Sequence, residues 1–166
     1  MKDDIIKEFI KESNAIEGVY DEKENKQSLL VWNYLTGNFF LTPKVVLETH
    51  HILMQNLLPE YEKGFFRRDY VMVNGRLGID PDDILSSISR WAERVRDDIL
   101  GLVDGSNEQK EGILKQRHIE YEKIHPFIDG NGRTGRMFMN WQRLRMGLPI
   151  LVIKESEKHE YYKWFA

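Results

Sequence analysis

The sequence predicts an all-α domain of about six to eight helices that carries one short β-hairpin. Apolar residues recur at the three- and four-residue spacing of amphipathic helices along most of the 166 residues. The pattern changes to strict alternation around Asn74-Gly75, and alternation around an Asn-Gly pair is typical of a tight hairpin. Thr42-Pro43 and Asp80-Pro81 pair a capping residue with a proline, which is how helices often start.

The first half of the chain holds three predicted helices and the hairpin. Residues 3–20 carry one apolar stripe that reaches Tyr20, and residues 26–36 form the second helix. The third helix starts at Pro43 and ends near Pro59. The hairpin follows within residues 70–80. Because a lone hairpin is only marginally stable, its presence suggests a task such as gripping an extended peptide.

The second half of the chain begins with a long helix opened by Asp80-Pro81 and reaching Leu102. Asp82 and Asp83 lie in its positive first turn, and a loop over residues 104–107 follows it. The remaining predicted elements are a helix over about 108–124, a glycine-rich turn, a helix through Met137 and Leu144 that Gly147 and Pro149 stop, and a last amphipathic segment with Tyr161, Tyr162 and Trp164.

Length and composition favour one globular domain over residues 1–166. Charged residues make up 31% and hydrophobic residues 41%, and the net charge of -3 provides no general attraction to nucleic acid or anionic membranes. The sequence has no cysteine, which excludes disulfides and thiolate metal sites. No signal-peptide core and no apolar run of roughly 20 residues is visible. We therefore expect a cytoplasmic protein that binds neither nucleic acid nor membrane.

The chemically informative stretch runs from His125 to Arg136 and reads HPFIDGNGRTGR. Glycine and asparagine over residues 130–132 tolerate positive φ, so successive N–H groups can form an anion-binding nest. The helix that follows adds its N-terminal N–H groups and positive dipole. Arg133 and Arg136 fall near one face of its first turn, where each can fork onto phosphate oxygens. Together these features predict a polyphosphate site.

Two side chains beside this predicted site suit chemistry on a phosphate. The Asp129 carboxylate precedes the nest, and a hard carboxylate beside phosphates suits Mg²⁺ (or Mn²⁺). A histidine such as His125, with an ordinary pKa of about 6.5, can take the proton of an attacking hydroxyl. Phe127 is apolar between polar neighbours, so we expect it to anchor the loop in the core. Each of these residues alone is more often structural, but their combination favours a site.

The spacing His-x-Phe-x-Asp-Gly-Asn-Gly-Arg-x-x-Arg resembles the signature of the Fic family, within the Fic/Doc superfamily. The helical layout and the upstream hairpin are also similar to that family, so the resemblance covers nearly the whole chain. It implies a Fic fold and the transfer of AMP from ATP to a Ser, Thr or Tyr hydroxyl of a target protein. It implies that His125 deprotonates this hydroxyl and that Asp129 holds Mg²⁺ against the α- and β-phosphates.

The resemblance assigns roles to the other features as well. Arg133 and Arg136 would clamp the outer phosphates, with Arg136 nearest the γ-phosphate, and the hairpin over 70–80 would be a flap that aligns a target segment by strand addition. Phosphate-transferring relatives carry a lysine near the position of Gly132, so glycine favours AMP transfer. Other members transfer UMP, GMP or phosphocholine, which leaves the donor open. The anion hole would consist of Gly130, Asn131 and Gly132.

A second motif lies far away, at Ser13 to Gly18. On a helix Ser13 and Glu17 share one face, beside the apolar Ile16, so Glu17 is expected to need a partner. On physical grounds alone, the alternative that Glu17 is an ordinary surface residue near a helix end is equally well supported. The segment also resembles the Fic inhibitory motif, Ser/Thr-x-x-x-Glu-Gly/Asn. In that case residues 3–20 form an N-terminal inhibitory helix of the class II type, and Glu17 pairs with Arg136 in the space of the γ-phosphate.

Three functions stay open on the sequence. The first is a protein adenylyltransferase that its own first helix inhibits. The second is the reverse reaction, with a deAMPylase or bifunctional enzyme in which Glu17 orients a water. The third is a catalytically quiet module that binds nucleotide or protein, which nothing in the motif favours. The sequence does not identify the target protein, and the chain itself is one candidate. A homo-oligomer is one alternative for its oligomeric state.

Overall fold

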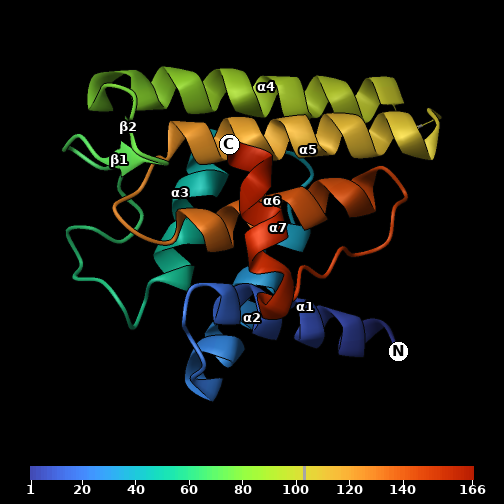
Figure 1. The fold of residues 1–166 in the computed structure, drawn as a ribbon, viewed down its shortest axis with the longest axis horizontal. Helices are drawn as coiled ribbons and strands as arrows, with labels where there is room; N and C mark the ends of the chain where they lie inside the picture. Colours follow the sequence, from blue (N-terminus) through green and yellow to red (C-terminus); the bar gives the residue numbers. More distant parts are fainter. Residues whose placement is uncertain (103) are drawn as a thin grey trace.

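The computed structural model describes residues 1–102 and 104–166 of the chain, and Figure 1 shows their arrangement. Within these residues the fold has seven α-helices and a two-stranded antiparallel hairpin, as the sequence predicts. The elements are α1 Lys2–Ile16, α2 Glu22–Thr36, α3 Pro43–Leu53, β1 Met72–Val73, β2 Arg76–Leu77, α4 Ile84–Leu102, α5 Asn107–Ile124, α6 Asn131–Arg145 and α7 Lys158–Tyr162, with short 3-10 helices at Pro81–Asp83, Glu155–Glu157 and Lys163–Phe165.

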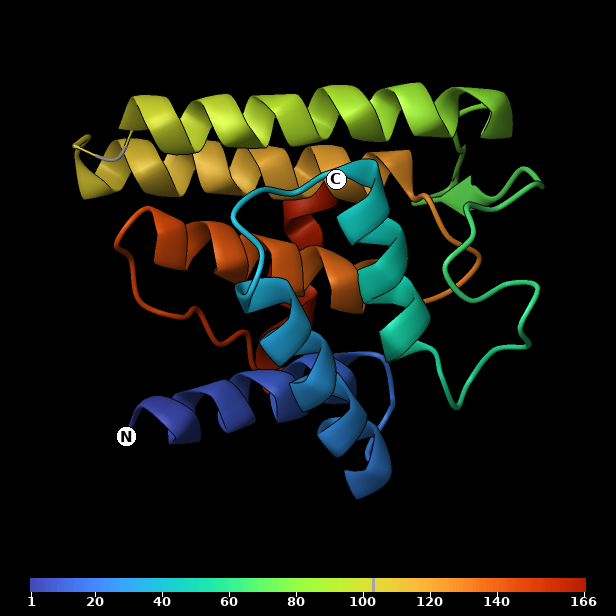
Figure 2. The ribbon, with the colours of Figure 1, turned by 180° about the vertical axis from the view of Figure 1, so that it is seen from behind.

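Helix α6 is the central element of the fold. It packs against α1, α2, α3, α4 and α5, and it is buried along most of its length. Figures 1 and 2 show α4 and α5 lying side by side along one edge, with α1 and α2 at the opposite edge and α6 between them. The C-terminal helix α7 crosses in front of α6 (Figure 1). Residues at the start of α6 therefore meet groups from both ends of the chain.

Local capping explains where several helices begin. The Thr42 side chain accepts a hydrogen bond from Val45 N at 3.2 Å, and Pro43 follows as the first helical residue of α3. Ser106 and Gln109 form a reciprocal capping box at the start of α5. These starts are readable from the sequence because each cap involves residues only a few positions apart.

Three predicted helix boundaries are wrong. The first helix does not continue to Tyr20: it ends at Ile16, and Tyr20 is 66% exposed. Gly18 adopts a left-handed φ of 72°, and Val19 N closes back onto Asn14 O at 3.0 Å, which ends the helix. Helix α2 starts at Glu22 rather than 26, because the Asp21 side chain caps it by accepting from Lys23 N.

The third helix stops at Leu53, well before Pro59. Side chains from elsewhere bind the carbonyl groups that are released at its end. Gln27 Nε2 donates to Ile52 O at 2.7 Å, and Lys63 Nζ donates to Gln55 O at 3.1 Å. Because these partners come from other parts of the chain, the local pattern around 54–58 does not reveal the end of the helix.

The hairpin is short and lies on the surface. Asn74 and Gly75 both have positive φ, 50° and 76°, as a primed turn requires. The register pairs Met72 with Leu77, and both side chains are well exposed. The turn chemistry thus determines the hairpin, whereas its strands contribute little to the core.

The main hydrophobic core lies between α6 and the helices around it, and it reaches the loop that carries the motif. Trp91, Tyr121, Phe127 and Phe138 are buried there. A smaller cluster of Ile16, Met139, Ile153 and Tyr161 joins the end of α1 to α6 and the C-terminal segment. Within residues 1–102 and 104–166, no helix combines the length and apolar character that crossing a bilayer requires.

Candidate functional site

The motif folds into a tight turn between α5 and α6. Helix α5 ends at Ile124, and His125 adopts a left-handed conformation with φ 49° and ψ 63°. A non-glycine residue there costs roughly 1–3 kcal/mol, so the surrounding structure must enforce it. Arg67 does so: its Nε donates to His125 O at 2.7 Å and its backbone N donates to Pro126 O at 2.9 Å. Gly130, with φ 88°, completes the turn.

The side chains of Phe127 and Asn131 hold the loop to the core. Asn131 accepts from Phe127 N at 2.9 Å and donates to Phe127 O at 2.8 Å. The Phe127 side chain is fully buried and stacks on the His50 ring with a centroid distance of 3.7 Å. The Asn131 side chain is therefore engaged within the loop, and its backbone N–H is the group that we expect to face an anion.

His50 supports the same loop from α3. Gly64 N donates to its Nδ1 at 2.9 Å, so its Nε2–H donates to Asp129 O, also at 2.9 Å. Burial lowers the pKa of His50 to about 4, so the imidazole stays neutral and keeps this tautomer. His50 positions the loop, and nothing in its local sequence marks that role.

His125 is half-buried and suited to accept a proton. Its Nδ1 lies 3.3 Å from Glu122 O; an N–H at that position donates to the carbonyl and leaves the Nε2 lone pair free. Burial lowers the pKa of His125 below 6.5. The ring is therefore neutral at pH 7, which a general base requires.

Arg133, at the start of α6, has guanidinium nitrogens that lack a hydrogen-bond partner in the described structure. The residue is 3% exposed, yet its Nε and Nη1 atoms have no hydrogen-bond partner within the described part of the chain. Nη2 lies 3.7 Å from Asp129 Oδ2 and 3.6 Å from Met54 Sδ. Leaving buried donors unpaired is costly. An anion bound at the N-terminal N–H groups of α6 would supply the missing acceptors.

Arg136, one turn further along α6, has a partner at each of its three guanidinium nitrogens instead. Its Nε donates to Ser13 Oγ at 2.8 Å, and its Nη2 donates to Ser13 O at 2.9 Å and to Glu17 Oε1 at 2.7 Å. Its Nη1 donates to the Tyr161 hydroxyl at 3.3 Å. The structure thus brings Ser13, Glu17 and Arg136 together from positions more than a hundred residues apart in the chain.

Gly132 makes room for this contact. A Cβ atom at that position would collide with Glu17 Oε1 and would lie 3.0 Å from Arg136 Nη1. The absence of a side chain therefore lets a carboxylate approach the first turn of α6. Glu17 is the group that uses the space, with 35% of its side chain exposed.

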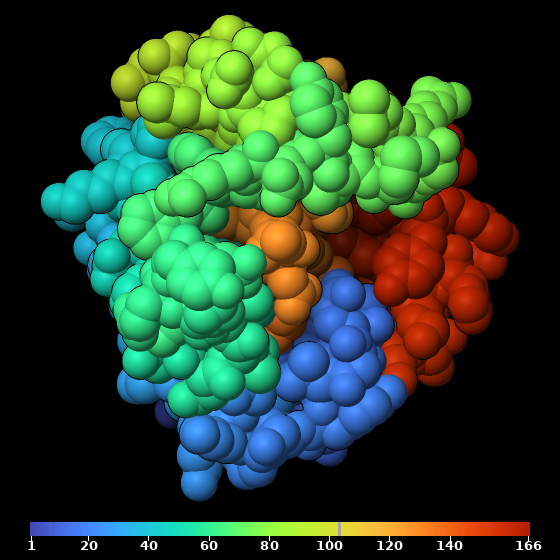
Figure 3. All heavy atoms as spheres, turned by 90° about the vertical axis from the view of Figure 1, so that its left-hand side faces the viewer, coloured from blue at the N-terminus to red at the C-terminus, as the bar shows by residue number. Residues whose placement is uncertain are grey.

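The predicted residues surround a surface hollow, which Figure 3 shows with the motif loop in orange at its floor. The hairpin, in green, borders one side, and the end of α1 and the C-terminal segment border the others (Figure 3). A cavity of about 270 Å³ is lined by Glu17, Val73, His125, Arg136, Tyr161 and their neighbours. A second of about 160 Å³ is lined by Glu17, His125 and residues 128–133.

Asp129 can contribute to a metal site but cannot form one alone. Its side chain is 63% exposed, and its Oδ1 accepts from Gly130 N at 2.7 Å. In the described residues, no group of three or more His, Cys, Asp or Glu side chains could hold a metal ion. One exposed carboxylate beside an anion cradle fits Mg²⁺, which takes one or two carboxylates and completes its shell with phosphate oxygens and water.

The structure also reveals a residue that links the motif to the hairpin. The Arg67 guanidinium donates to the carbonyls of Asp69, Ile79 and Ile124, in addition to that of His125. It thereby ties both bases of the hairpin to the turn that carries His125. Buried arginines of this kind have no local sequence pattern, so the sequence does not mark Arg67 as a site residue.

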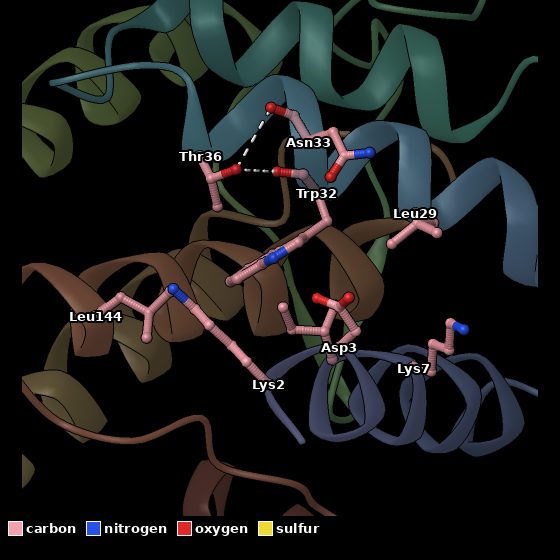
Figure 4. A pocket seen from close by; sticks show the side chains of 9 residues that line it. Lys2, Asp3, Lys7, Leu29, Trp32, Asn33, Thr36 and Leu144 are labelled. Atoms are coloured by element: carbon pink, nitrogen blue, oxygen red, sulfur yellow. Dashed lines mark hydrogen bonds between the residues drawn. The ribbon is translucent and has the colours of Figure 1, made fainter.

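A separate cavity of about 420 Å³ lies between α1 and α2, at the other end of α1 from Glu17 (Figure 4). It is lined by Lys2, Asp3, Trp32, Thr36 and neighbouring residues, and it contains none of the predicted site residues. The Thr36 hydroxyl donates to Trp32 O within its own helix. Because the cavity holds no residue of the predicted motifs, the motif hollow is the better candidate site.

Comparisons with known proteins identify relatives of this chain. The sequence model of the Fic/DOC family matches residues 40–142. The chain is 33% identical over 122 residues to "Protein adenylyltransferase Fic" of Drosophila erecta, covering 74% of this chain and 23% of that protein. It is 33% identical over 130 residues to the protein of that name from Culex quinquefasciatus, covering 76% and 24%. The chain thus spans about a quarter of the length of these relatives.

Solved structures show the same fold at lower identity. A Fic domain containing signaling protein from Bacteroides thetaiotaomicron superposes with a TM-score of 0.78 at 19% identity, covering 97% of this chain and 70% of that one. A Fic family protein from Desulfovibrio desulfuricans superposes with a TM-score of 0.70 at 21% identity, covering 98% and 56%.

Proposed function

The chain belongs to the Fic/DOC family, and we propose that it is a protein adenylyltransferase that transfers AMP from ATP to a Ser, Thr or Tyr hydroxyl of a target protein. The observation that carries the proposal is the first turn of α6. The buried Arg133, with two unpaired nitrogens, lies there beside the predicted anion cradle and the neutral His125, which can act as a base. Relatives of the same family that are named for this activity support the choice of AMP.

In the proposed reaction, the triphosphate lies at the N-terminus of α6, and Arg133 donates to its oxygens. The target hydroxyl oxygen attacks the α-phosphorus while His125 Nε2 takes the hydroxyl proton. The bond from the α-phosphorus to the oxygen that bridges to the β-phosphate breaks, and pyrophosphate leaves. When bound, Mg²⁺ would be held by Asp129 and would neutralise part of the phosphate charge.

The hairpin is the proposed docking element for the target. Its two strands pair only with each other in the described structure, so an extended target segment can add to a free edge. Arg67 connects the hairpin to His125 O, which fixes the distance between a docked segment and the base. Main-chain pairing of this kind accepts many target sequences, and the chain itself is one candidate target.

Glu17 is the proposed inhibitor of the reaction. Its Oε1 atom lies 2.7 Å from Arg136 Nη2. The carboxylate therefore pairs with the guanidinium group that would otherwise bind the outermost phosphate. An ATP molecule bound beside it would have to place its outer phosphate elsewhere, which would spoil the in-line geometry at the α-phosphorus. We therefore expect the transferase to have little activity while Glu17 holds Arg136.

Mass spectrometry of the Glu17→Gly variant with ATP and Mg²⁺ tests the proposal. The expected result is a mass gain of one AMP. The fraction of molecules that carry it should be much larger for Glu17→Gly than for the wild-type protein, and the gain should be absent in the Glu17→Gly, His125→Ala double variant. Equal labelling with and without Glu17 would overturn the inhibition. ATP binding without transfer in Glu17→Gly would instead favour a catalytically inactive nucleotide-binding module. Replacing ATP by UTP or GTP in the same assay determines the donor.

Removal of AMP is the second candidate function, because Glu17 and His125 line the same hollow. A carboxylate there can orient a water toward a phosphorus bound at the cradle, and His125 can protonate the leaving hydroxyl. AMP-modified Glu17→Gly protein is the substrate for the test. Release of AMP from this substrate when wild-type protein and Mg²⁺ are added, but not when Glu17→Gly protein is added as the enzyme, would establish this reaction.

A further inference from the structure

Arg136 has a partner that does not belong to the inhibitory helix. Tyr161, on α7, accepts a hydrogen bond from Arg136 Nη1 at 3.3 Å, and the guanidinium carbon lies 5.6 Å from the centre of its ring. The other partners of Arg136, Ser13 and Glu17, lie in or directly after α1. If the end of α1 withdraws from the site, Tyr161 is the contact that remains.

The hydrogen bonds at the Tyr161 hydroxyl run in one direction when His118 carries its ring proton on Nδ1. Arginine only donates, so the Tyr161 oxygen accepts from Arg136. Burial lowers the pKa of His118 to about 3, so this ring is neutral and its Nε2, 2.7 Å from the hydroxyl, can accept the Tyr161 proton. Burial also raises the pKa of Tyr161, which keeps the phenol neutral. In this tautomer, His118 turns a lone pair of the hydroxyl toward Arg136.

Packing holds this chain of three side chains in place. His118, Tyr161 and Arg136 are 1%, 3% and 2% exposed. Tyr161 packs in the cluster with Ile16 and Met139, and further rings of the C-terminal segment surround it. A helix as short as α7 has little stability of its own, so its position depends on these contacts. Tyr161 lies outside residues 40–142, which are the part of the chain that the family comparison matches.

We propose that Tyr161, oriented by His118, is a positioning residue that keeps Arg136 aimed at the outer phosphate of the nucleotide once Glu17 has left. The inference rests on the proposed function. A neutral phenol leaves the positive charge of Arg136 available to a phosphate, whereas the Glu17 carboxylate offsets that charge. Glu17 is thus the exchangeable partner and Tyr161 the permanent one.

The test removes the hydroxyl in the Glu17→Gly background. Tyr161→Phe keeps the ring and its packing, and the matched control Tyr61→Phe removes the same hydroxyl from a side chain that is 70% exposed and lies outside the hollow. We expect Tyr161→Phe to raise the Kd and KM for ATP about tenfold, in line with the loss of an ordered charged contact. AMP, which has no outer phosphates, should bind unchanged, and kcat should fall less than KM rises. The control variant should match its parent.

The second variant is His118→Leu, which removes the acceptor of the Tyr161 proton. It is expected to share the ATP-selective loss, with thermal unfolding used to confirm that each variant is folded. Unchanged ATP binding in Tyr161→Phe, or an equal loss for ATP and AMP, would overturn the inference while AMP transfer by Glu17→Gly keeps the proposed function. Failure of Glu17→Gly to transfer AMP would sink the proposed function, and the comparison of ATP and AMP binding would still decide the role of Tyr161.

Discussion

Arg133 and Arg136 lie three residues apart on the same helix face, yet their surroundings differ. Arg133 is buried with two nitrogens that lack a partner in the described structure, whereas all three guanidinium nitrogens of Arg136 donate to Ser13, Glu17 or Tyr161. One half of the predicted phosphate site is therefore open, and the chain itself fills the other half. The helix supplies the same geometry to both arginines, so the difference comes from what tertiary packing places in front of each.

Under the proposed function, this contrast would let one site bind a nucleotide and still be held inactive. The open half keeps buried donors unpaired, a cost that an incoming phosphate would relieve. The filled half keeps the Nε and Nη2 donors of Arg136 on Ser13 and Glu17, so an incoming phosphate must compete with Glu17 for this guanidinium group. Since Glu17 is partly exposed, the ion pair can separate without unfolding the core.

The support shared by both halves is the Phe127 anchor. Phe127→Ala empties a fully buried position beneath the loop and should lower the free energy of unfolding by about 3–5 kcal/mol. Urea unfolding followed by circular dichroism measures the loss. Phe40→Ala, at a position that is 48% exposed, is the control and should change the stability little. A similar loss in both variants would show that Phe127 does not anchor the loop.

The contrast in hydrogen bonding should appear as a contrast in stability. Arg136→Ala leaves Ser13, Glu17 and Tyr161 without their partner and should cost about 2–4 kcal/mol. Arg133→Ala removes a side chain whose Nε and Nη1 have no partner and should change the free energy of unfolding by no more than about 1 kcal/mol. Denaturant unfolding of the two variants under one set of conditions compares them. Equal costs would contradict the division into an open and a filled half.

Nucleotide binding should show the reverse order. With Glu17 present, Arg133→Ala should weaken ATP binding about tenfold, whereas Arg136→Ala should leave it nearly unchanged because Arg136 is already occupied. In the Glu17→Gly background, both substitutions should weaken it. Isothermal titration calorimetry with ATP and Mg²⁺ measures all four affinities. If Arg136→Ala weakened binding equally in both backgrounds, Glu17 would not be competing with the nucleotide.

The smallest expected effect concerns His125, which serves both halves. Its pKa lies below 6.5 because of burial, so the base loses its activity only as the pH falls below that value and protonates the ring. The kcat/KM of Glu17→Gly should therefore be level near pH 7 and decline on the acid side with a midpoint below 6.5. A pH–rate profile with saturating Mg²⁺ gives the midpoint. A value at or above 6.5 would contradict this assignment of the base.

Several features were determined by the sequence alone, because the residues that cause them are close together in the chain. The hairpin turn follows from Asn74-Gly75, and the start of α3 follows from Thr42-Pro43. The turn between α5 and α6 follows from the glycine and asparagine residues of the motif. The fold class was predictable for the same reason, since it depends on apolar spacing within each helix.

Other features were decided by tertiary structure. The first helix stops at Ile16, and the third stops at Leu53 where side chains from other segments bind its carbonyls. The roles of Arg67, His50 and Tyr161 depend on carbonyls and side chains from distant parts of the chain.

The contact of Glu17 with Arg136 was expected only through the family resemblance, and it spans 119 positions of sequence. Arg133 and Arg136 share most of their neighbours in the sequence, so the local sequence does not distinguish the paired arginine from the unpaired one. Whether an arginine finds a partner depends on which distant segment packs beside it, and that depends on the core as a whole. The local sequence thus predicts the turn at which we expect an anion to bind, and tertiary packing leaves Arg133 unpaired there while it pairs Arg136.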